Sequence, residues 1–157
     1  MKVLMVCLGN ICRSPLAEGI LQEKVKQHHL NWVVDSAGTN GIHVAEAPHK
    51  LSQKVAKANG LDISQQISRQ FFAKDFEEYD RIYVMAKDVM QEVKRIAGYK
   101  FDANKVDYFL NELHAGENKD VPDPWYGNED GYVKVYALIN KTCDAIIEKC
   151  LATNSTN

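Results

Sequence analysis

The chain has 157 residues, of which 45% are hydrophobic and 25% are charged, as expected for one globular domain with its own core. Nineteen Lys and Arg against 21 Asp and Glu leave no basic surface for nucleic acid. No apolar run approaches the roughly 20 residues that cross a bilayer, and no signal peptide is visible. The four cysteines are too sparse for a disulfide scaffold. We therefore expect a cytoplasmic monomer without nucleic-acid or membrane partners.

Apolar runs and helical repeats alternate along the chain. The expected elements are strands over residues 2–7, 32–34, 81–85 and 106–110, a helix with Ser14 as N-cap and Pro15 as first residue, helices ending at Gly60 and Gly98, and a last helix from Val133 to Cys150. This order predicts a single-domain, three-layer α/β fold in which helices flank a parallel sheet. We expect the domain to cover residues 1–152, and residues 153–157 to form a flexible tail.

Residues 7–15 (CLGNICRSP) join the first strand to the first helix, where parallel sheets bind ligands. Backbone N–H groups in such a loop can turn inward and bind an anion. Gly9 and Asn10 tolerate the left-handed backbone conformations that a tight loop needs. Arg13 adds a planar guanidinium that matches two phosphate oxygens. The segment therefore predicts an oxyanion-binding loop.

Cys7 opens this loop at the end of the strand. A helix N-terminus and a nearby arginine stabilise a thiolate, so we expect Cys7 to ionise readily and act as a nucleophile towards phosphorus. Ser14 can both cap the helix and donate its hydroxyl to the sulfur. The alternative interpretation is a buried cysteine beside a capping serine, with Arg13 on the surface.

A second segment, residues 121–127 (VPDPWYG), supplies an acid. Prolines on both sides of Asp123 stiffen the loop and can hold its carboxyl over the anion site. As a general acid, Asp123 would contribute about 10²–10⁴ in rate. Trp125 offers an aromatic wall for a flat substrate group. Taken alone, an Asp-Pro segment usually indicates a simple turn, and the catalytic interpretation depends on its combination with residues 7–15.

Together, residues 7–15 and 123–127 resemble the low-molecular-weight protein tyrosine phosphatase family. The resemblance extends from residue 2 to about residue 150 and includes residues 35–39, Arg69-Gln70 and Asp75-Phe76. It implies a sheet of four parallel strands, a phosphate-binding loop after the first strand, no metal and no cofactor. It also implies a phosphotyrosine-containing protein as substrate and a phosphocysteine intermediate.

The resemblance also implies residue roles. Cys7 would attack phosphorus, Arg13 would bind the equatorial oxygens, and Asp123 would protonate the leaving phenol and then deprotonate the attacking water. Asn10 would hold the loop shape, with Ser14 and Ser36 in its hydrogen-bond network. The residues expected to bind phosphate or substrate are Leu8, Gly9, Asn10, Ile11, Cys12, Ser14, Ile42, Trp125 and Tyr126.

The sequence departs from the family pattern in places that bear on rate and specificity. Ile42 stands where an aromatic residue is common, Gln66 where a histidine is common, and Ala86 where an aspartate is usual. Residues 49–51 (HKL) replace the usual Asp-Pro-Arg. Trp125 replaces a common tyrosine and leaves Tyr126 as the phosphorylatable residue of that pair.

Three other functions stay open. A phosphoarginine phosphatase is a close rival, although that branch commonly has threonine at the position of Ile11. An arsenate reductase would need relay cysteines after the third strand, where none occurs until Cys143. A catalytically weak phosphotyrosine-binding module is the non-enzymatic alternative. Cys12 either forms a protective disulfide with Cys7 or is a packing residue.

Overall fold

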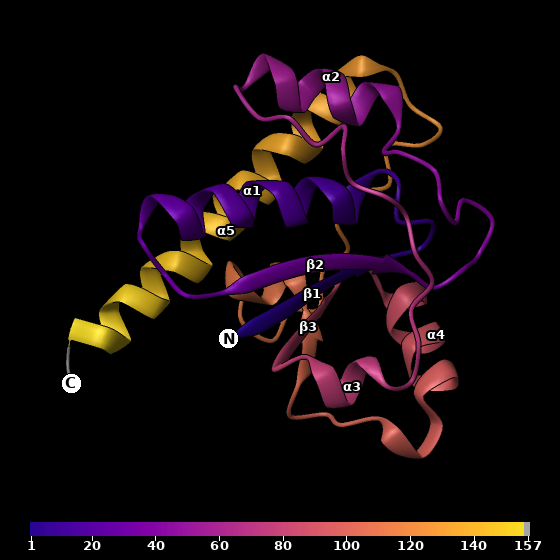
Figure 1. Cartoon of the computed structure of the whole chain (residues 1–157), viewed down its shortest axis with the longest axis vertical. Helices are drawn as coiled ribbons and strands as arrows, with labels where there is room; N and C mark the ends of the chain where they lie inside the picture. Colours follow the sequence, from indigo (N-terminus) through magenta and orange to yellow (C-terminus); the bar gives the residue numbers. More distant parts are fainter. Residues whose placement is uncertain (156–157) are drawn as a thin grey trace.

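The computed structural model describes residues 1–155, in which a four-stranded sheet separates two layers of helices (Figure 1). The strands are β1 (Lys2–Cys7), β2 (Val33–Gly38), β3 (Arg81–Val84) and β4 (Val106–Tyr108). They are all parallel and lie in the order β2-β1-β3-β4. The predicted three-layer α/β fold with four parallel strands is confirmed.

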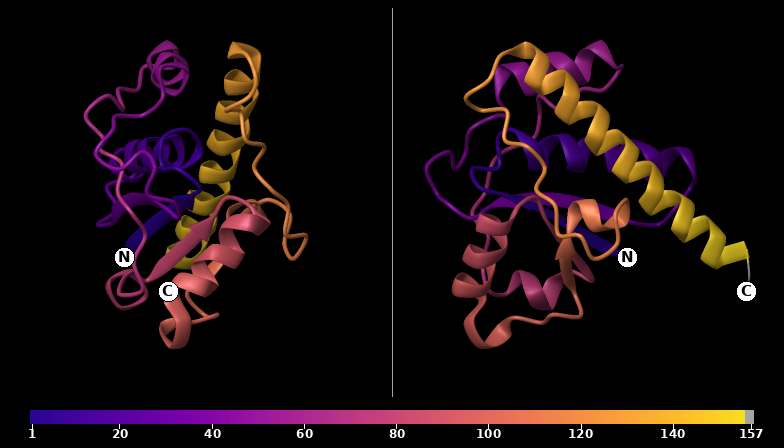
Figure 2. Two further views of the ribbon diagram at one scale, coloured as in Figure 1. Left: turned by 90° about the vertical axis from the view of Figure 1, so that its right-hand side faces the viewer. Right: turned by 180° about the vertical axis from the view of Figure 1, so that it is seen from behind.

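The helices divide between the two faces of the sheet. The long helix α5 (Glu129–Ser155) packs with α1 (Arg13–Gln27) over one face, and α2 (Lys50–Ala58) packs against both (Figure 2). The other face carries α3 (Asp75–Glu78) and α4 (Lys87–Ala97). Two 3-10 turns, η1 (Gly98–Lys100) and η2 (Phe109–Glu112), follow α4 and β4. Within residues 1–155, no helix is long and apolar enough to cross a membrane.

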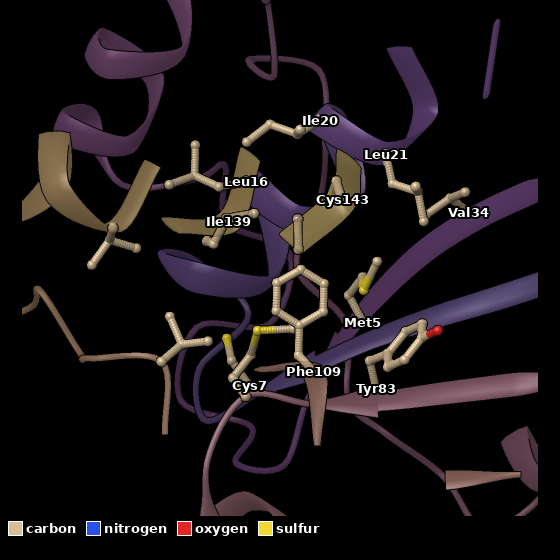
Figure 3. Close-up of a cluster of buried hydrophobic side chains, with 14 of the residues drawn as sticks. Met5, Cys7, Leu16, Ile20, Leu21, Val34, Tyr83, Phe109, Ile139 and Cys143 are labelled. Atoms are coloured by element: carbon tan, nitrogen blue, oxygen red, sulfur yellow. The ribbon is translucent and has the colours of Figure 1, made fainter. Parts of the chain in front are cut away.

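Both faces of β1 are buried, which explains its continuous run of apolar residues. Met5 and Cys7 point towards α1 and α5, where they meet Leu16, Phe109 and Cys143 in one cluster (Figure 3). The alternate residues of the strand join a second cluster under α3 and α4. Burial of one such side chain stabilises the fold by about 1.5–3 kcal/mol. Packing on both sides thus fixes the strand that ends in Cys7.

Three local expectations differ from the structure. Helix α1 begins at Arg13, so Ser14 lies inside its first turn and is not the N-cap. The fourth strand ends at Tyr108, because residues 109–112 turn into η2 instead of continuing to Leu110. Helix α5 includes residues 153–155 of the expected tail, and residues 156–157 lie outside the described part of the chain.

The strand order places the candidate site. From β1 the chain crosses through α1 to β2 on one side, and it later places β3 on the other side of β1. The direction of winding therefore changes at β1, and a crevice opens beyond its carboxyl end. Cys7 is the last residue of that strand. The candidate nucleophile thus lies at the topological switch point.

Candidate active site

Asn10 shapes the loop that follows β1. Its backbone has φ +57°, a left-handed conformation that asparagine adopts more readily than most residues. Its side-chain amide donates to Ser14 Oγ and Ser36 Oγ, both at 2.8 Å, and its Oδ1 accepts from the Arg69 N–H at 3.0 Å. The side chain is buried, so all of these bonds are shielded from water. Asn10 thus ties the loop to α1, to β2 and to the segment before α3.

The two glycines near the loop are needed for space and not for a left-handed backbone. Both Gly9 and Asn10 tolerate a left-handed backbone, and within this loop Asn10 is the residue with positive φ. A Cβ on Gly9 would lie 3.1 Å from the His43 ring. A Cβ on Gly38, at the end of β2, would lie 2.9 Å from the Leu8 carbonyl oxygen. Both positions let neighbouring segments approach the loop closely.

The Cys7 sulfur forms two hydrogen bonds at the floor of the loop. The Asn10 backbone N–H donates to Sγ at 3.3 Å, and Ser14 Oγ lies 3.0 Å from Sγ, where either atom can be the donor. Ser14 Oγ also accepts from the Asn10 side chain. The expected hydroxyl–sulfur contact therefore exists, although the expected helix cap does not.

Several main-chain donors of the loop have no protein acceptor. In the described part of the chain, the backbone N–H groups of Leu8, Gly9, Ile11 and Cys12 donate to no other protein group. Free N–H groups beside a cysteine, at the N-terminus of a 15-residue helix, form an anion-binding concavity. The loop thus has the donors that the oxygens of a phosphate group require.

Arg13 and Asp123 meet at the mouth of the loop. Arg13 is buried, and its Nη1 donates to the Val121 carbonyl at 3.0 Å, which fixes the guanidinium. Its Nη2 lies 3.7 Å from Asp123 Oδ2. The other carboxylate oxygen of Asp123 accepts from the Trp125 N–H at 3.0 Å, so the acid sits in a local turn. The interpretation of Arg13 as a surface residue is excluded.

These residues line one pocket of about 420 Å³. It is lined by Cys7, Leu8, Gly9, Ile11, Cys12, Arg13, Asn40, Ile42, His43, Asp123, Trp125 and Tyr126. The structure therefore brings together every site residue expected from the sequence except Asn10 and Ser14, which are buried behind the loop. Asn40 was not expected here, because in the sequence it is one of several turn residues after the second strand.

Two histidines hold Trp125 at the pocket wall. The His43 and His49 rings lie 5.4 and 5.3 Å from the Trp125 ring, measured between centroids. His49 also stacks on Tyr132 of α5 at 5.2 Å and caps α2 by accepting from the Leu51 N–H. Burial, followed by the charges of His43 and Lys50, lowers the pKa of His49. A neutral ring at this position suits both the cap and the stacking.

The hydrogen-bond network behind the loop ends at Glu18, which sequence reasoning missed. Ser36 Oγ donates to Glu18 Oε1 at 2.9 Å, and Ser36 in turn accepts from Asn10. Burial raises the pKa of Glu18 to about 7. The nearby Gln66 donates to the Pro15 carbonyl, while its buried Oε1 has no partner in the described chain. The only signal for Glu18 in the sequence was an acidic residue among the apolar residues of this helix.

Cys12 differs from Cys7 in its surroundings. Its Sγ lies 3.5 Å from the Tyr132 hydroxyl, and both side chains are buried. Burial raises the pKa of the Cys12 thiol to about 11. Cys12 is therefore protonated at neutral pH, unlike a nucleophilic cysteine. Both Cys7 and Cys12 are free thiols in this structure.

The donor set is one for oxyanions and not for cations. Residues 1–155 contain no group of three or more His, Cys, Asp or Glu side chains placed to hold a metal ion. A cysteine, free main-chain N–H groups and a buried arginine instead meet one carboxyl group. A parallel α/β sheet with this oxyanion site after its first strand is typical of a phosphatase.

Comparisons with known proteins agree with that class. Residues 2–156 match the family model described as low molecular weight phosphotyrosine protein phosphatase. A human protein of that name is 32% identical over 150 residues, which cover 94% of each chain. The crystal structure of a protein tyrosine phosphatase from Entamoeba histolytica has a TM-score of 0.87 and 33% identity, covering 98% of this chain and 99% of that one. The chain belongs to the low molecular weight phosphotyrosine protein phosphatase family and is a phosphoric monoester hydrolase.

A more distant structure marks the limit of the fold comparison. The YwlE arginine phosphatase has a TM-score of 0.86 but only 22% identity, over 95% of each chain. That similarity shows a shared fold. It does not indicate which phosphorylated residue this chain hydrolyses.

Proposed function

We propose that this phosphatase hydrolyses aryl phosphomonoesters, with phosphotyrosine in proteins as substrate, through a phosphocysteine on Cys7. The proposal is carried by the convergence of Cys7, the free N–H groups of its loop, Arg13 and Asp123 on one pocket. The loop donors, Arg13 and an acid lie in the same pocket as the Cys7 sulfur. One site therefore supplies a nucleophile, groups that stabilise negative charge and a group for proton transfer.

In the first step the Cys7 thiolate attacks phosphorus, so that an S–P bond forms while the bond from phosphorus to the phenolic oxygen breaks. The free N–H groups and Arg13 bind the phosphoryl oxygens and stabilise their charge. Asp123 transfers its proton to the leaving phenolic oxygen. When the S–P bond later breaks, Ser14 and Asn10 again form their hydrogen bonds with the Cys7 sulfur.

In the second step water attacks the phosphocysteine. The Asp123 carboxylate, left by the first step, accepts a proton from this water. A new O–P bond forms, the S–P bond breaks, and the thiolate of Cys7 and inorganic phosphate are released. Both steps use the same carboxyl group in opposite protonation states, which requires it to lie beside the loop, as Asp123 does.

The pocket wall favours an aromatic ester over phosphoarginine. Ile11 lines the pocket with an apolar side chain, and Trp125 and Ile42 add further apolar surface near the mouth. A flat phenyl ring gains from this apolar contact, whereas a polar guanidinium would lose hydration against the same walls. Free thiols at Cys7 and Cys12 support a reducing compartment, for which we propose the cytoplasm.

The experiment that tests the function is a pH–rate profile with an aryl phosphate. It compares the wild type with Cys7→Ser, Arg13→Ala and Asp123→Asn. We expect the first two variants to lose essentially all turnover, and Asp123→Asn to lose the alkaline limb while a slow reaction remains. Turnover that is slow in the wild type and unchanged in Cys7→Ser would instead support a phosphotyrosine-binding module. Parallel assays with phosphotyrosine and phosphoarginine peptides decide between the two substrates.

A further inference from the structure

The outward face of helix α2 is uniformly basic. Lys50, Lys54 and Lys57 are all exposed, whereas the inward face buries Ser52, Val55 and Ala56. Residues 47–61 contain no Asp or Glu, although the whole chain has more acidic than basic residues. The helix therefore concentrates positive charge on a protein whose formal net charge is -2.

These lysines border a surface hollow at the outer side of α2. It has a volume of about 550 Å³ and lies between α2 and the segment that follows it. Its lining residues are Lys50, Gln53, Lys54, Lys57, Gly60, Leu61, Asp62 and Ser64. Asp62 is the one acidic residue among them, and its carboxylate accepts the Ser64 N–H at 2.8 Å. The hollow thus carries a net positive charge and has room for side chains of a partner.

Two of the three lysines have no ionic partner of their own. Lys54 pairs with Glu129 at the start of α5 at 3.0 Å, in an exposed pair that contributes little stability. Lys50 and Lys57 form no ion pair with any residue of the described chain. Both ammonium groups are therefore available to a carboxylate from outside, with no internal bond to break.

Helix α2 starts at the mouth of the catalytic pocket. His49 immediately precedes it, packs on Trp125 of the pocket wall, and donates its N–H to the Ile11 carbonyl of the nucleophile loop at 2.8 Å. Lys57 lies seven residues beyond Lys50, which corresponds to about 10 Å along a helix axis. An extended peptide covers that length with about three residues. In Figure 2, α2 lies at the same end of the molecule as the start of α5.

We propose that the lysine face of α2 (Lys50, Lys54 and Lys57) binds acidic residues of the protein substrate that lie close in sequence to its phosphotyrosine. This inference rests on the proposed function, because it describes the flank of a substrate whose phosphate lies on the Cys7 loop. Attraction to this face offsets the general repulsion between acidic substrates and a net acidic enzyme. Aromatic side chains for base stacking are absent from the lining residues, which favours an acidic peptide over nucleic acid.

The test compares charge variants on three phosphotyrosine peptides of equal length. One peptide has neutral flanks, one has Glu residues before the phosphotyrosine, and one has them after it. The double variant Lys50→Gln/Lys57→Gln removes the unpaired charges. The matched control is Lys26→Gln/Lys141→Gln, which removes two exposed lysines without ion pairs in the described chain from α1 and α5. The readouts are kcat/KM for each peptide and for p-nitrophenyl phosphate.

We expect the wild type to prefer one acidic peptide over the neutral peptide by about 5–10-fold at low salt, and the preference to fall as salt rises. The α2 variant should bring that ratio close to one and leave the rate on p-nitrophenyl phosphate unchanged. The control should keep the wild-type ratio. Equal kcat/KM for all three peptides in the wild type, or an unchanged ratio in the α2 variant, would overturn the inference.

A second measurement is independent of catalysis. An unphosphorylated Glu-rich peptide is titrated into the wild type, and amide chemical shifts are followed by NMR. Shifts that cluster on residues 50–64, and that disappear in the α2 variant, support the lysine face even if no phosphate ester is hydrolysed and the proposed function fails. The absence of shifts in that region would overturn the inference. Tighter binding of a short single-stranded DNA to the same region would overturn it as well.

Discussion

The guanidinium of Arg13 lies 3.7 Å from the carboxylate of Asp123, although the two residues come from opposite parts of the sequence. Arg13 is buried and held by the Val121 carbonyl, whereas the Asp123 side chain is 38% exposed. In this arrangement the group proposed to bind phosphate is partly neutralised by the group proposed to protonate the leaving oxygen. A bound oxyanion must therefore share Arg13 with Asp123 or displace the carboxylate.

The first prediction follows from that competition. Asp123→Asn removes the negative charge at the mouth, so inorganic phosphate should inhibit the variant more strongly than the wild type. Exposed ion pairs contribute about 0.2–1 kcal/mol, which corresponds to an inhibition constant lower by up to about fivefold. The measurement is competitive inhibition by phosphate with p-nitrophenyl phosphate as substrate. Weaker inhibition of the variant would show that Asp123 helps to bind the anion and does not compete with it.

The second prediction concerns Glu18 and the pH dependence of stability. Burial raises its folded-state pKa to about 7 from an ordinary value of 4.5. Between these two pH values the unfolded chain releases the proton first, so the contribution of Glu18 to stability is complete below pH 4.5 and is lost as pH rises through 7. Glu18→Gln keeps an acceptor for Ser36 and removes the titration.

We expect the Glu18→Gln variant to gain stability relative to the wild type as pH rises from 4.5 to 8, by roughly 1–3 kcal/mol. Urea unfolding at several pH values measures the difference in the free energy of unfolding. Glu23→Gln, an exposed change on the same helix, is the control and should give a difference that is nearly independent of pH. A flat difference for Glu18→Gln as well would contradict the assigned pKa shift.

The third prediction separates the two loop cysteines by reactivity. Burial raises the pKa of Cys12 to about 11, so only about one Cys12 thiol in a thousand is ionised at pH 8. Iodoacetamide should therefore modify Cys7 long before Cys12, and inorganic phosphate should protect Cys7. Peptide mapping at increasing times gives both rates. Faster modification of Cys12 would show that the donors around Cys7 do not activate its sulfur.

The fourth prediction concerns oxidation of the same pair. Hydrogen peroxide would accept two electrons and two protons from the thiols of Cys7 and Cys12, leaving a disulfide and two molecules of water. We expect mass mapping to find a Cys7–Cys12 bridge whose reduction restores activity, and Cys12→Ser to lose this recovery. Sulfonic acid on Cys7 without any bridge would instead mark Cys12 as a packing residue beside Tyr132.

The sequence predicts the sheet and the pocket because both depend on local patterns. The apolar run of β1 is long enough to specify a strand buried on both faces, and residues 7–15, which begin at its last residue, carry the candidate nucleophile, the turn and the arginine together. The prolines on both sides of Asp123 mark a rigid loop, but its role was assigned only because this loop occurs together with residues 7–15.

The parts that sequence reasoning missed are set by distant contacts. Glu18 looks like an exposed helix residue until Ser36 of β2 packs against it. Ser14 was expected to cap α1, but its hydroxyl contacts Asn10 and Cys7, and the helix starts two residues earlier than expected. Gly9 lies beside the His43 ring, where a Cβ would come within 3.1 Å, and no local pattern in the sequence indicates this contact.

The covalent intermediate on Cys7 is the central claim, and Asp123→Asn is the variant in which to trap it. With p-nitrophenyl phosphate the leaving group needs no protonation, so loss of Asp123 should slow the hydrolysis of phosphocysteine more than its formation. Rapid quenching in denaturant at neutral pH, followed by mass mapping, should find one phosphate per chain on Cys7 within the first turnover. Steady turnover with no phosphate on Cys7, or with phosphate on another residue, would contradict the mechanism.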